Sequence, residues 1–286
     1  MANNPIKIFF DSNVILGSAQ LRLLDDDQLS YYTGLGILKK PPPFIYSSEL
    51  LGKIKRLLNE KELIEIEPFV SRRVRGEVQQ ILKSVLEKIL KPLKVQSEIS
   101  KMSIEDKKIF ERNIYQIFIL KLPIYVNEII DNFSTIMVDR DDCEILRDDI
   151  FNNIYRPLLP KFKQLIEKFE ISGISNPEKD KEYPEYCCMK LNFRSFRDQT
   201  AATKVINYKK ITDLLILGEA IYSYKKLVSE LKRPPEFYFV SNDTIFISVS
   251  QEGMVFDKIP RLINQNYGIG VLDSKHMSEA LSKYLK

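Results

Sequence analysis

Histidine, cysteine and tryptophan are nearly missing from this sequence. Its 286 residues include one histidine, three cysteines and no tryptophan. Catalysis by a histidine base, or a zinc site of imidazole and thiolate ligands, therefore has almost no residues to use. Cys143, Cys187 and Cys188 form no C-x-x-C pair, which argues against a disulfide framework and favours a reducing cytoplasm. The side chains left for chemistry are carboxylates, hydroxyls and amines.

Long apolar runs are missing as well. The most apolar stretch, residues 114–126, contains Lys121 and Pro123 and is shorter than the ~20 residues of a membrane-spanning helix. The first residues, MANNPIKIFF, lack the basic region and apolar run of a secretory signal. Glycine and proline are not enriched, and charges of both signs are abundant. We therefore expect a globular cytoplasmic protein that has no membrane partner.

Strand and helix patterns alternate near both ends of the chain. The apolar run IKIFF at residues 6–10 predicts a buried strand. Further strands are predicted at residues 63–70, 237–241 and 269–272, and helices at 48–59, from 71 toward 90, at 212–231 and up to 285. This alternation predicts an α/β fold, a Rossmann-like parallel sheet flanked by helices. The run of Pro41, Pro42 and Pro43 is interpreted as a stiff connector.

The middle of the chain has helical periodicity and little strand pattern. We predict a discontinuous α/β core, residues 1–90 and 199–286, and an all-helical insertion at residues 91–198. Residues 86–200 hold nineteen basic and twenty acidic side chains, a net charge of −1, against 24 basic and 19 acidic in the rest, a net of +5. The positive excess thus belongs to the α/β part, where an anionic substrate would bind.

Two aspartates lie at the ends of predicted strands. Asp11 comes after IKIFF, and Asp243 comes shortly after the strand that contains FYFV. The carboxyl ends of parallel strands meet at one edge of a sheet, where α/β folds place their ligands. The alternative for both residues is a structural one, as a helix cap or turn residue.

Two further carboxylates lie on apolar helix faces. Glu77 is three residues after Val74 and four before Ile81, so it must be paired, hydrogen-bonded or bound to a cation. Its alternative is a buried ion pair with Arg72, Arg73 or Arg75. Asp213 is four residues before Leu217, and its alternative is a first-turn acid that the helix dipole favours.

Four converging carboxylates would need a counter-charge. At ~4 Å, two like charges repel by ~4 kcal/mol at a near-surface dielectric. One or two divalent cations would remove this repulsion, and carboxylates suit Mg²⁺ and Mn²⁺. The sequence therefore predicts that Asp11, Glu77, Asp213 and Asp243 form a metal site.

The acidic motifs resemble those of PIN domains in their order. The motifs are FFDSNVIL, SRRVRGEV, ITDLLILGEA and FVSNDTIF. The resemblance covers about residues 5–85 and 205–286, and it implies an endoribonuclease that hydrolyses single-stranded or structured RNA with Mg²⁺ or Mn²⁺. It implies the metal site Asp11, Glu77, Asp213 and Asp243, supported by Asn13 and by Ser241 or Asn242. The long insertion departs from compact PIN domains.

Basic residues near these motifs are candidates for contacts with phosphates. They are Arg72, Arg73, Arg75, Arg194, Arg197, Lys204, Lys209 and Lys210. Since the attacking group would be water and not the 2′-hydroxyl, DNA is a second substrate class. The insertion is a candidate surface for a protein partner or a homo-oligomer.

Other readings of the sequence remain open or are discounted. The chain could be a non-catalytic PIN-like module that binds nucleic acid or protein, or the toxin of a toxin–antitoxin pair. Haloacid dehalogenase-type phosphatases require an aspartate where this chain has Asn13. The acidic run of residues 139–149 lacks the turn glycine of a metal loop and is interpreted as a solvated helix surface.

Overall fold

A computed structural model describes residues 5–59, 65–83, 93–160, 212–231, 234–243, 245–247 and 258–285. The chain divides into two compact units. The first comprises Met1–Met137, Pro234–Ser241 and Leu272–Lys286, and the second comprises Val138–Arg233 and Asn242–Val271. Within the described residues, no helix has the length and apolar character needed to cross a membrane.

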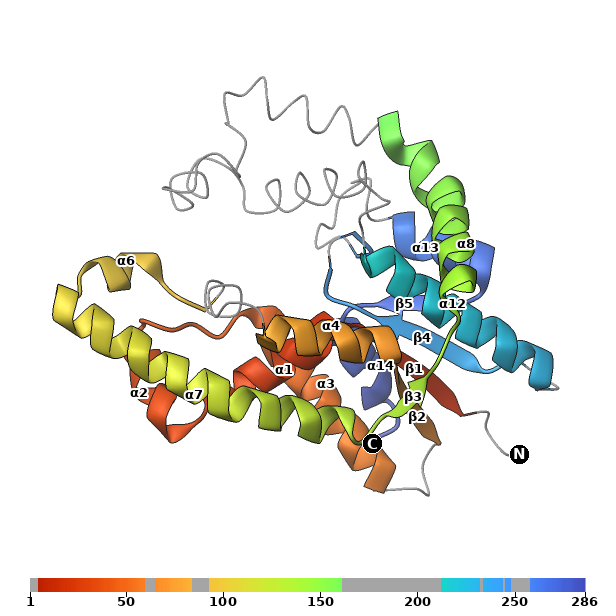
Figure 1. Ribbon diagram of the computed structural model, residues 1–286. Coiled ribbons are helices and arrows are strands. Elements are labelled where there is room, and N and C mark those ends of the chain that lie inside the picture. Colours follow the sequence, from red (N-terminus) through yellow and green to blue (C-terminus); the bar gives the residue numbers. More distant parts are fainter. Residues whose placement is uncertain are drawn as a thin grey trace. The chain divides into compact units, whose positions relative to one another are not determined.

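A five-stranded sheet forms the centre of the fold (Figure 1). Its order is β3-β2-β1-β4-β5, and the pairings β1–β2, β1–β4 and β2–β3 are parallel. The strands are β1 (Ile6–Phe10), β2 (Ile66–Ser71), β3 (Ser134–Ile136), β4 (Glu236–Val240) and β5 (Gly270–Leu272). This arrangement confirms the predicted α/β class with a parallel sheet flanked by helices.

The central strand, β1, is buried on both faces. All five of its residues are buried, as its near-continuous apolar sequence predicts for a parallel sheet covered on both sides. Lys7 is the one charged residue of this strand. Its ammonium pairs with Glu67 of β2 and lies 5.5 Å from the ring centroid of Phe69. A buried lysine therefore has both an ion-pair and a cation–π partner.

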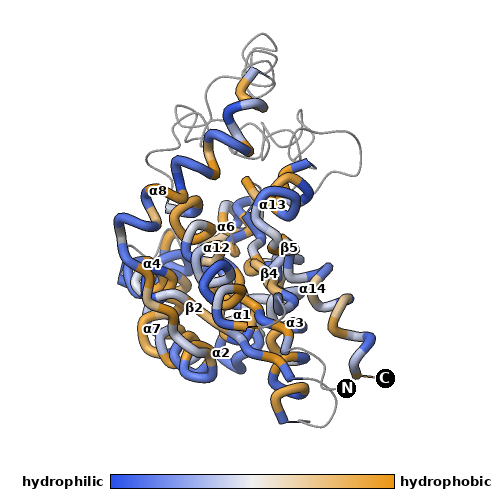
Figure 2. Tube along the Cα trace, turned by 90° about the vertical axis from the view of Figure 1, so that its right-hand side faces the viewer, coloured by the Kyte–Doolittle hydropathy of each residue, from blue (hydrophilic) through white to orange (hydrophobic). Residues whose placement is uncertain are grey.

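The helices of the first unit pack mainly against one another, and α3 and α4 also contact β2. Helix α1 packs on α3, α4 and α7, and α3 packs on α14. The bounds are α1 (Ser12–Leu24), α2 (Asp27–Gly34), α3 (Pro42–Asn59), α4 (Arg72–Lys83), α6 (Gln96–Ser100), α7 (Ile104–Ile130) and α14 (Ser274–Ser282). Figure 2 shows apolar residues along α7, several of which, including Phe110, Phe118 and Val126, are buried.

Helix α3 begins six residues before the predicted start at Ser48. The interpretation of the proline run as a stiff connector is therefore wrong for Pro42 and Pro43, which occupy the first turn of α3. A proline fits there because the first helical N–H groups have no intrahelical acceptor and the ring presets a helical φ. The carbonyl of Pro41 accepts hydrogen bonds from the N–H groups of Phe44 and Ile45.

Strand β3 shows that the predicted insertion is not all-helical. Ser134–Ile136 follows α7 and pairs in parallel with Phe69–Ser71 of β2. The prediction was wrong here because a three-residue edge strand with two exposed side chains has no alternating apolar pattern to detect. The division into a discontinuous core and an insertion at 91–198 remains a prediction, and residues 161–198 lie outside the described part.

The second unit is mainly helical where it is described. It contains α8 (Arg140–Ile150), a π-helix η1 (Phe151–Tyr155), a 3-10 turn η2 (Arg156–Leu158), α12 (Thr212–Glu230) and α13 (Ile259–Tyr267). Helix α12 packs on α8, and a Cβ at Gly218 would lie 3.4 Å from the carbonyl oxygen of Cys143. Glycine at this position therefore permits a close approach of the two helices.

Gly268 ends α13 in a left-handed conformation, with a φ of 77°. We expect Gly268→Ala to lower the free energy of unfolding by about 1–3 kcal/mol, the cost of a strained backbone, because a Cβ there would also lie 3.0 Å from Cε1 of Tyr224. Urea unfolding followed by circular dichroism measures this loss. Gly52→Ala is the control: Gly52 lies inside α3 with no heavy atom within 4 Å of an added Cβ, so this change should stabilise by roughly 0.5–1 kcal/mol.

Candidate functional site

Three strands of the first unit end at the same edge of the sheet. Phe9 is level with Phe69 of β2, and Phe10 is level with Val240 of β4. Continuing this register places Asp11 level with Ser241. The strand order reverses between β1 and β4, because β2 and β3 continue on one side of β1 and β4 and β5 on the other. Asp11 and Ser241 therefore lie at the topological switch point, where open α/β sheets bind ligands.

A compact hydrogen-bond network surrounds the carboxylate of Asp11, which is 1% exposed. Its Oδ1 accepts from the N–H of Ser12 at 2.7 Å and from the hydroxyl of Ser12 at 3.3 Å. Its Oδ2 accepts from Nδ2 of Asn13 at 2.7 Å and from the hydroxyl of Ser241 at 2.6 Å. Asn13 Nδ2 also lies 3.2 Å from Ser241 Oγ. The predicted supporting residues Asn13 and Ser241 thus both contact Asp11.

The backbone fixes this network from both strands. The N–H of Asp11 donates to the carbonyl of Val240 at 3.0 Å, and the N–H of Ser241 donates to the carbonyl of Leu272 at 3.1 Å. Asp11 is also the N-cap of α1, so the helix dipole stabilises its negative charge. The capping alternative is confirmed for Asp11, and it is compatible with a ligand-binding role because a cap fixes the orientation of the carboxylate.

Glu77 contributes a second carboxylate in the first unit. It lies in α4, whose first residue follows Ser71 at the end of β2, and Ser71 caps this helix by accepting from the N–H of Val74 at 3.0 Å. Val74 and Val78 are fully buried, and Glu77 itself is half-buried. Its Oε2 is buried with no hydrogen-bond partner within the described residues. A buried carboxylate oxygen without a donor is costly, so this oxygen has capacity for a ligand.

Arg75 is engaged inside the protein and not with Glu77. Its guanidinium donates to the carbonyls of Ile130 and Phe133 at 3.1 and 3.3 Å and lies 4.0 Å from the carboxylate of Asp131. It therefore ties α4 to the end of α7. Arg72 is exposed and Arg73 half-buried, and their predicted contacts with nucleic acid stay predictions. The other predicted contacts, Arg194, Arg197, Lys204, Lys209 and Lys210, lie outside the described residues.

Asp213 and Asp243 belong to the second unit. Asp213 is in the first turn of α12, and Asp243 begins a turn in which its Oδ1 accepts from the N–H of Ile245 at 3.0 Å. Burial raises the pKa of Tyr155 well above its ordinary value, and the negative charges of Asp243 and Asp213 raise that pKa further. Both carboxylates therefore act on the same buried hydroxyl. Asn242, between Ser241 and Asp243, is half-buried, and its supporting role stays a prediction.

Two buried polar groups of the second unit were not found from the sequence. Tyr155 is fully buried, and Glu219 is buried with its Oε1 3.9 Å from the thiol of Cys143. No motif surrounds Tyr155 in FNNIYRP. Glu219 carries a detectable signal, because it stands in the apolar sequence LLILGEAI of α12.

The chemistry of the carboxylates fits a hard divalent cation in part. Asp11 and Glu77 supply oxygen donors, and Glu77 Oε2 has unused capacity. The Asp11 carboxylate, however, already accepts four hydrogen bonds, which matches its four lone pairs, so a cation would have to replace one of them. Among the described residues, no group of three or more His, Cys, Asp and Glu side chains is arranged to hold a metal ion.

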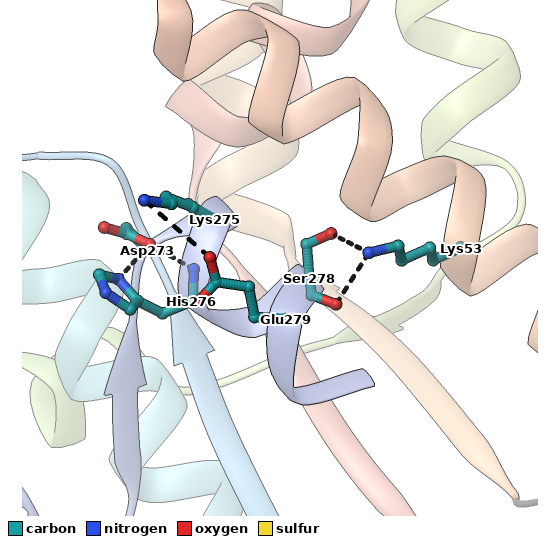
Figure 3. Close-up of polar contacts among 6 residues, drawn as sticks. All are labelled: Lys53, Asp273, Lys275, His276, Ser278 and Glu279. Atoms are coloured by element: carbon teal, nitrogen blue, oxygen red, sulfur yellow. Dashed lines mark hydrogen bonds and ion pairs between the residues drawn. The ribbon is translucent and has the colours of Figure 1, made fainter. Parts of the chain in front are cut away.

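The single histidine is engaged in capping α14. His276 donates its N–H to Oδ1 of Asp273 at 2.7 Å, and its Nδ1 lies 2.8 Å from the same oxygen (Figure 3). On α14, the hydroxyls of Ser278 and Ser282 each accept from the ammonium of Lys53, at 2.8 Å. Figure 3 shows that Lys53 reaches Ser278 from α3. The Lys53 contacts join α3 to α14, and the Asp273–His276 contacts cap α14, so both sets have a structural role.

No protein-family model, no curated protein and no solved structure matches this chain. The fold class therefore rests on the sheet and helices described above, and the resemblance to PIN domains stays a prediction.

Removing the hydroxyl of Ser241 tests the network. We expect Ser241→Ala to lower the free energy of unfolding by about 1.5–3 kcal/mol, the range for a hydrogen bond to a charged group. Urea unfolding measures the loss. Ser18→Ala, a buried serine of α1 outside this network, should cost less than about 1 kcal/mol. Equal losses for the two variants would show that the hydrogen bond to Asp11 adds no stability beyond that of an ordinary buried serine.

Proposed function

We propose that this protein is a metal-dependent phosphodiesterase, an endoribonuclease whose carboxylates Asp11, Glu77, Asp213 and Asp243 hold Mg²⁺ or Mn²⁺. The observation that carries the proposal is the oriented, buried carboxylate of Asp11 at the switch point of the sheet. The buried, unpartnered oxygen of Glu77 in the same unit supports it. Asp213 and Asp243 enter the proposal through the resemblance to PIN domains and through their shared action on Tyr155.

The residues of this chain would have distinct tasks in that reaction. When bound, the metal ion lowers the pKa of a water and neutralises charge on phosphate oxygens. Asn13 and Ser241 keep the Asp11 carboxylate in one orientation, as outer-shell hydrogen bonds do for metal ligands. Arg72 and Arg73, at the start of α4 and thus near the carboxyl end of β2, would contact the phosphate backbone. Water as the nucleophile requires no 2′-hydroxyl, so DNA stays a second substrate class.

A non-catalytic module is the second candidate. The observation that favours it is the complete use of the Asp11 acceptor sites by Ser12, Asn13 and Ser241. A carboxylate satisfied in this way can serve purely to join α1 to β4, and the protein would then bind nucleic acid or a protein partner without cleaving a bond.

Metal binding is the first test. We expect Mn²⁺ at one hundred times its dissociation constant to raise the free energy of unfolding of the wild-type protein by about 2.7 kcal/mol, and chelator to reverse this gain. Glu77→Gln should lose most of the gain, since it removes one charged oxygen donor. Glu49→Gln, an exposed glutamate of α3, should keep it. An unchanged response in Glu77→Gln would remove Glu77 from the ligand set.

Cleavage of labelled single-stranded RNA and DNA is the second test. With Mn²⁺, we expect Asp11→Asn and Asp243→Asn each to reduce kcat/KM by on the order of 100-fold or more, as when one electrostatic stabiliser is removed from an active site. Asp273→Asn is the control, because Asp273 also follows a strand and caps a helix but is not a predicted ligand. It should lose stability and keep activity.

A non-catalytic module would give a different result. The wild-type protein would then cleave neither substrate with Mn²⁺, while the folded Asp11→Asn variant would bind RNA as tightly as the wild type.

A further inference from the structure

Tyr155 makes a buried, long-range hydrogen bond, and this tyrosine has no role in the reaction proposed above. Its side chain is 0% exposed and lies at the end of the π-helix η1. Its hydroxyl donates to the carbonyl of Ile245 at 2.9 Å, across 90 residues of sequence. Both residues belong to the second unit. A π-helix widens the helical turn and often marks a functional position, and here its last residue is the tyrosine that makes this contact.

The carbonyl that Tyr155 contacts is part of the turn that begins at Asp243. The N–H of Ile245 donates to Oδ1 of Asp243 at 3.0 Å. The N–H groups of Phe246 and Ile247 donate to the main-chain carbonyl of Asp243, at 3.1 and 3.2 Å. Ile245 thus accepts from Tyr155 through its carbonyl and donates to the Asp243 carboxylate through its N–H. A displacement of this residue would displace the carboxylate.

Burial and the neighbouring charges both favour the protonated, donor form of the Tyr155 hydroxyl. Burial is the main cause that raises its pKa, and the charges of Asp243 and Asp213 add to it. An ionised phenol would lose its proton and could not donate to the carbonyl of Ile245. The two carboxylates of this unit that the sequence assigned to the metal site therefore favour the same protonation state of one tyrosine.

We propose that Tyr155 is a positioning residue for Asp243: its hydroxyl holds Ile245, and through it the turn that orients the Asp243 carboxylate toward its cation. This inference rests on the proposed function for the identity of the ligand. Its structural half, the control of the turn by Tyr155, stands on the contacts alone. The apolar side chains of Ile245 and Phe246, both fully buried, also hold the turn in the core.

The test compares two tyrosines of the second unit in the full-length protein. Tyr155→Phe keeps the ring and removes only the hydroxyl. Tyr267→Phe is the matched control, because Tyr267 is also buried and donates a hydrogen bond, but to Asp149 of α8 at 2.8 Å. We expect Tyr155→Phe to weaken Mn²⁺ binding, measured by calorimetry, by about 10–100-fold, as loss of an outer-shell partner does. Tyr267→Phe should leave the affinity within about twofold.

Hydrogen–deuterium exchange separates the two halves of the inference. In Tyr155→Phe, the amides of Ile245, Phe246 and Ile247 should exchange at least about tenfold faster than in Tyr267→Phe, since the turn loses its anchor. Equal exchange in the two variants overturns the positioning role. If Tyr155→Phe exchanges faster but the wild-type protein binds no Mn²⁺, the role of Tyr155 in the turn is confirmed and the metal proposal is overturned. Faster exchange with unchanged Mn²⁺ affinity in Tyr155→Phe overturns the link between the turn and the cation.

Discussion

The buried carboxylate of Asp11 is the constraint on which the candidate site depends. A charge that is 1% exposed is tolerated only because every acceptor position meets a donor. Those donors come from the first turn of α1 and from the residue after β4. The same contacts that compensate for desolvation therefore join β1, α1 and β4 at one point. Stability and orientation are two results of one network here, which is why Asp11 can serve as a cap and as a proposed ligand.

The sequence predicted this part of the fold well because its signals are local. An apolar run closed by Asp-Ser-Asn specifies a strand, a cap and a helix within a few residues, and Ser71 repeats the logic after β2. Helix α12 and strand β4 were found in the same way. The resemblance to PIN domains named Asn13 and Ser241 as supporting residues, and the shared edge of β1 and β4 brings both into contact with Asp11.

What the sequence did not reveal depends on distant partners. Strand β3 exists because β2 offers a free edge, and nothing within Ser134–Ile136 indicates this. Tyr155 acquires its role from a carbonyl 90 residues away. Arg75 donates through Nη2 to two main-chain carbonyls at the end of α7, partners that the sequence does not show, and its predicted contact with phosphate stays a prediction. Side chains whose partners are main-chain carbonyls are hard to predict, because a carbonyl group has no residue identity.

The connection between Asp11 and Ser241 also has a consequence for biosynthesis. The two residues are 230 positions apart, so the long stretch of chain between them must be translated before the central strand gains its second neighbour. During that interval IKIFF is an apolar segment with one unsatisfied edge, and such segments promote aggregation. Lys7, its second residue, places a charge within it, as gatekeeper residues do near apolar strands. The ion pair with Glu67 of β2 can then shield that charge long before β4 arrives.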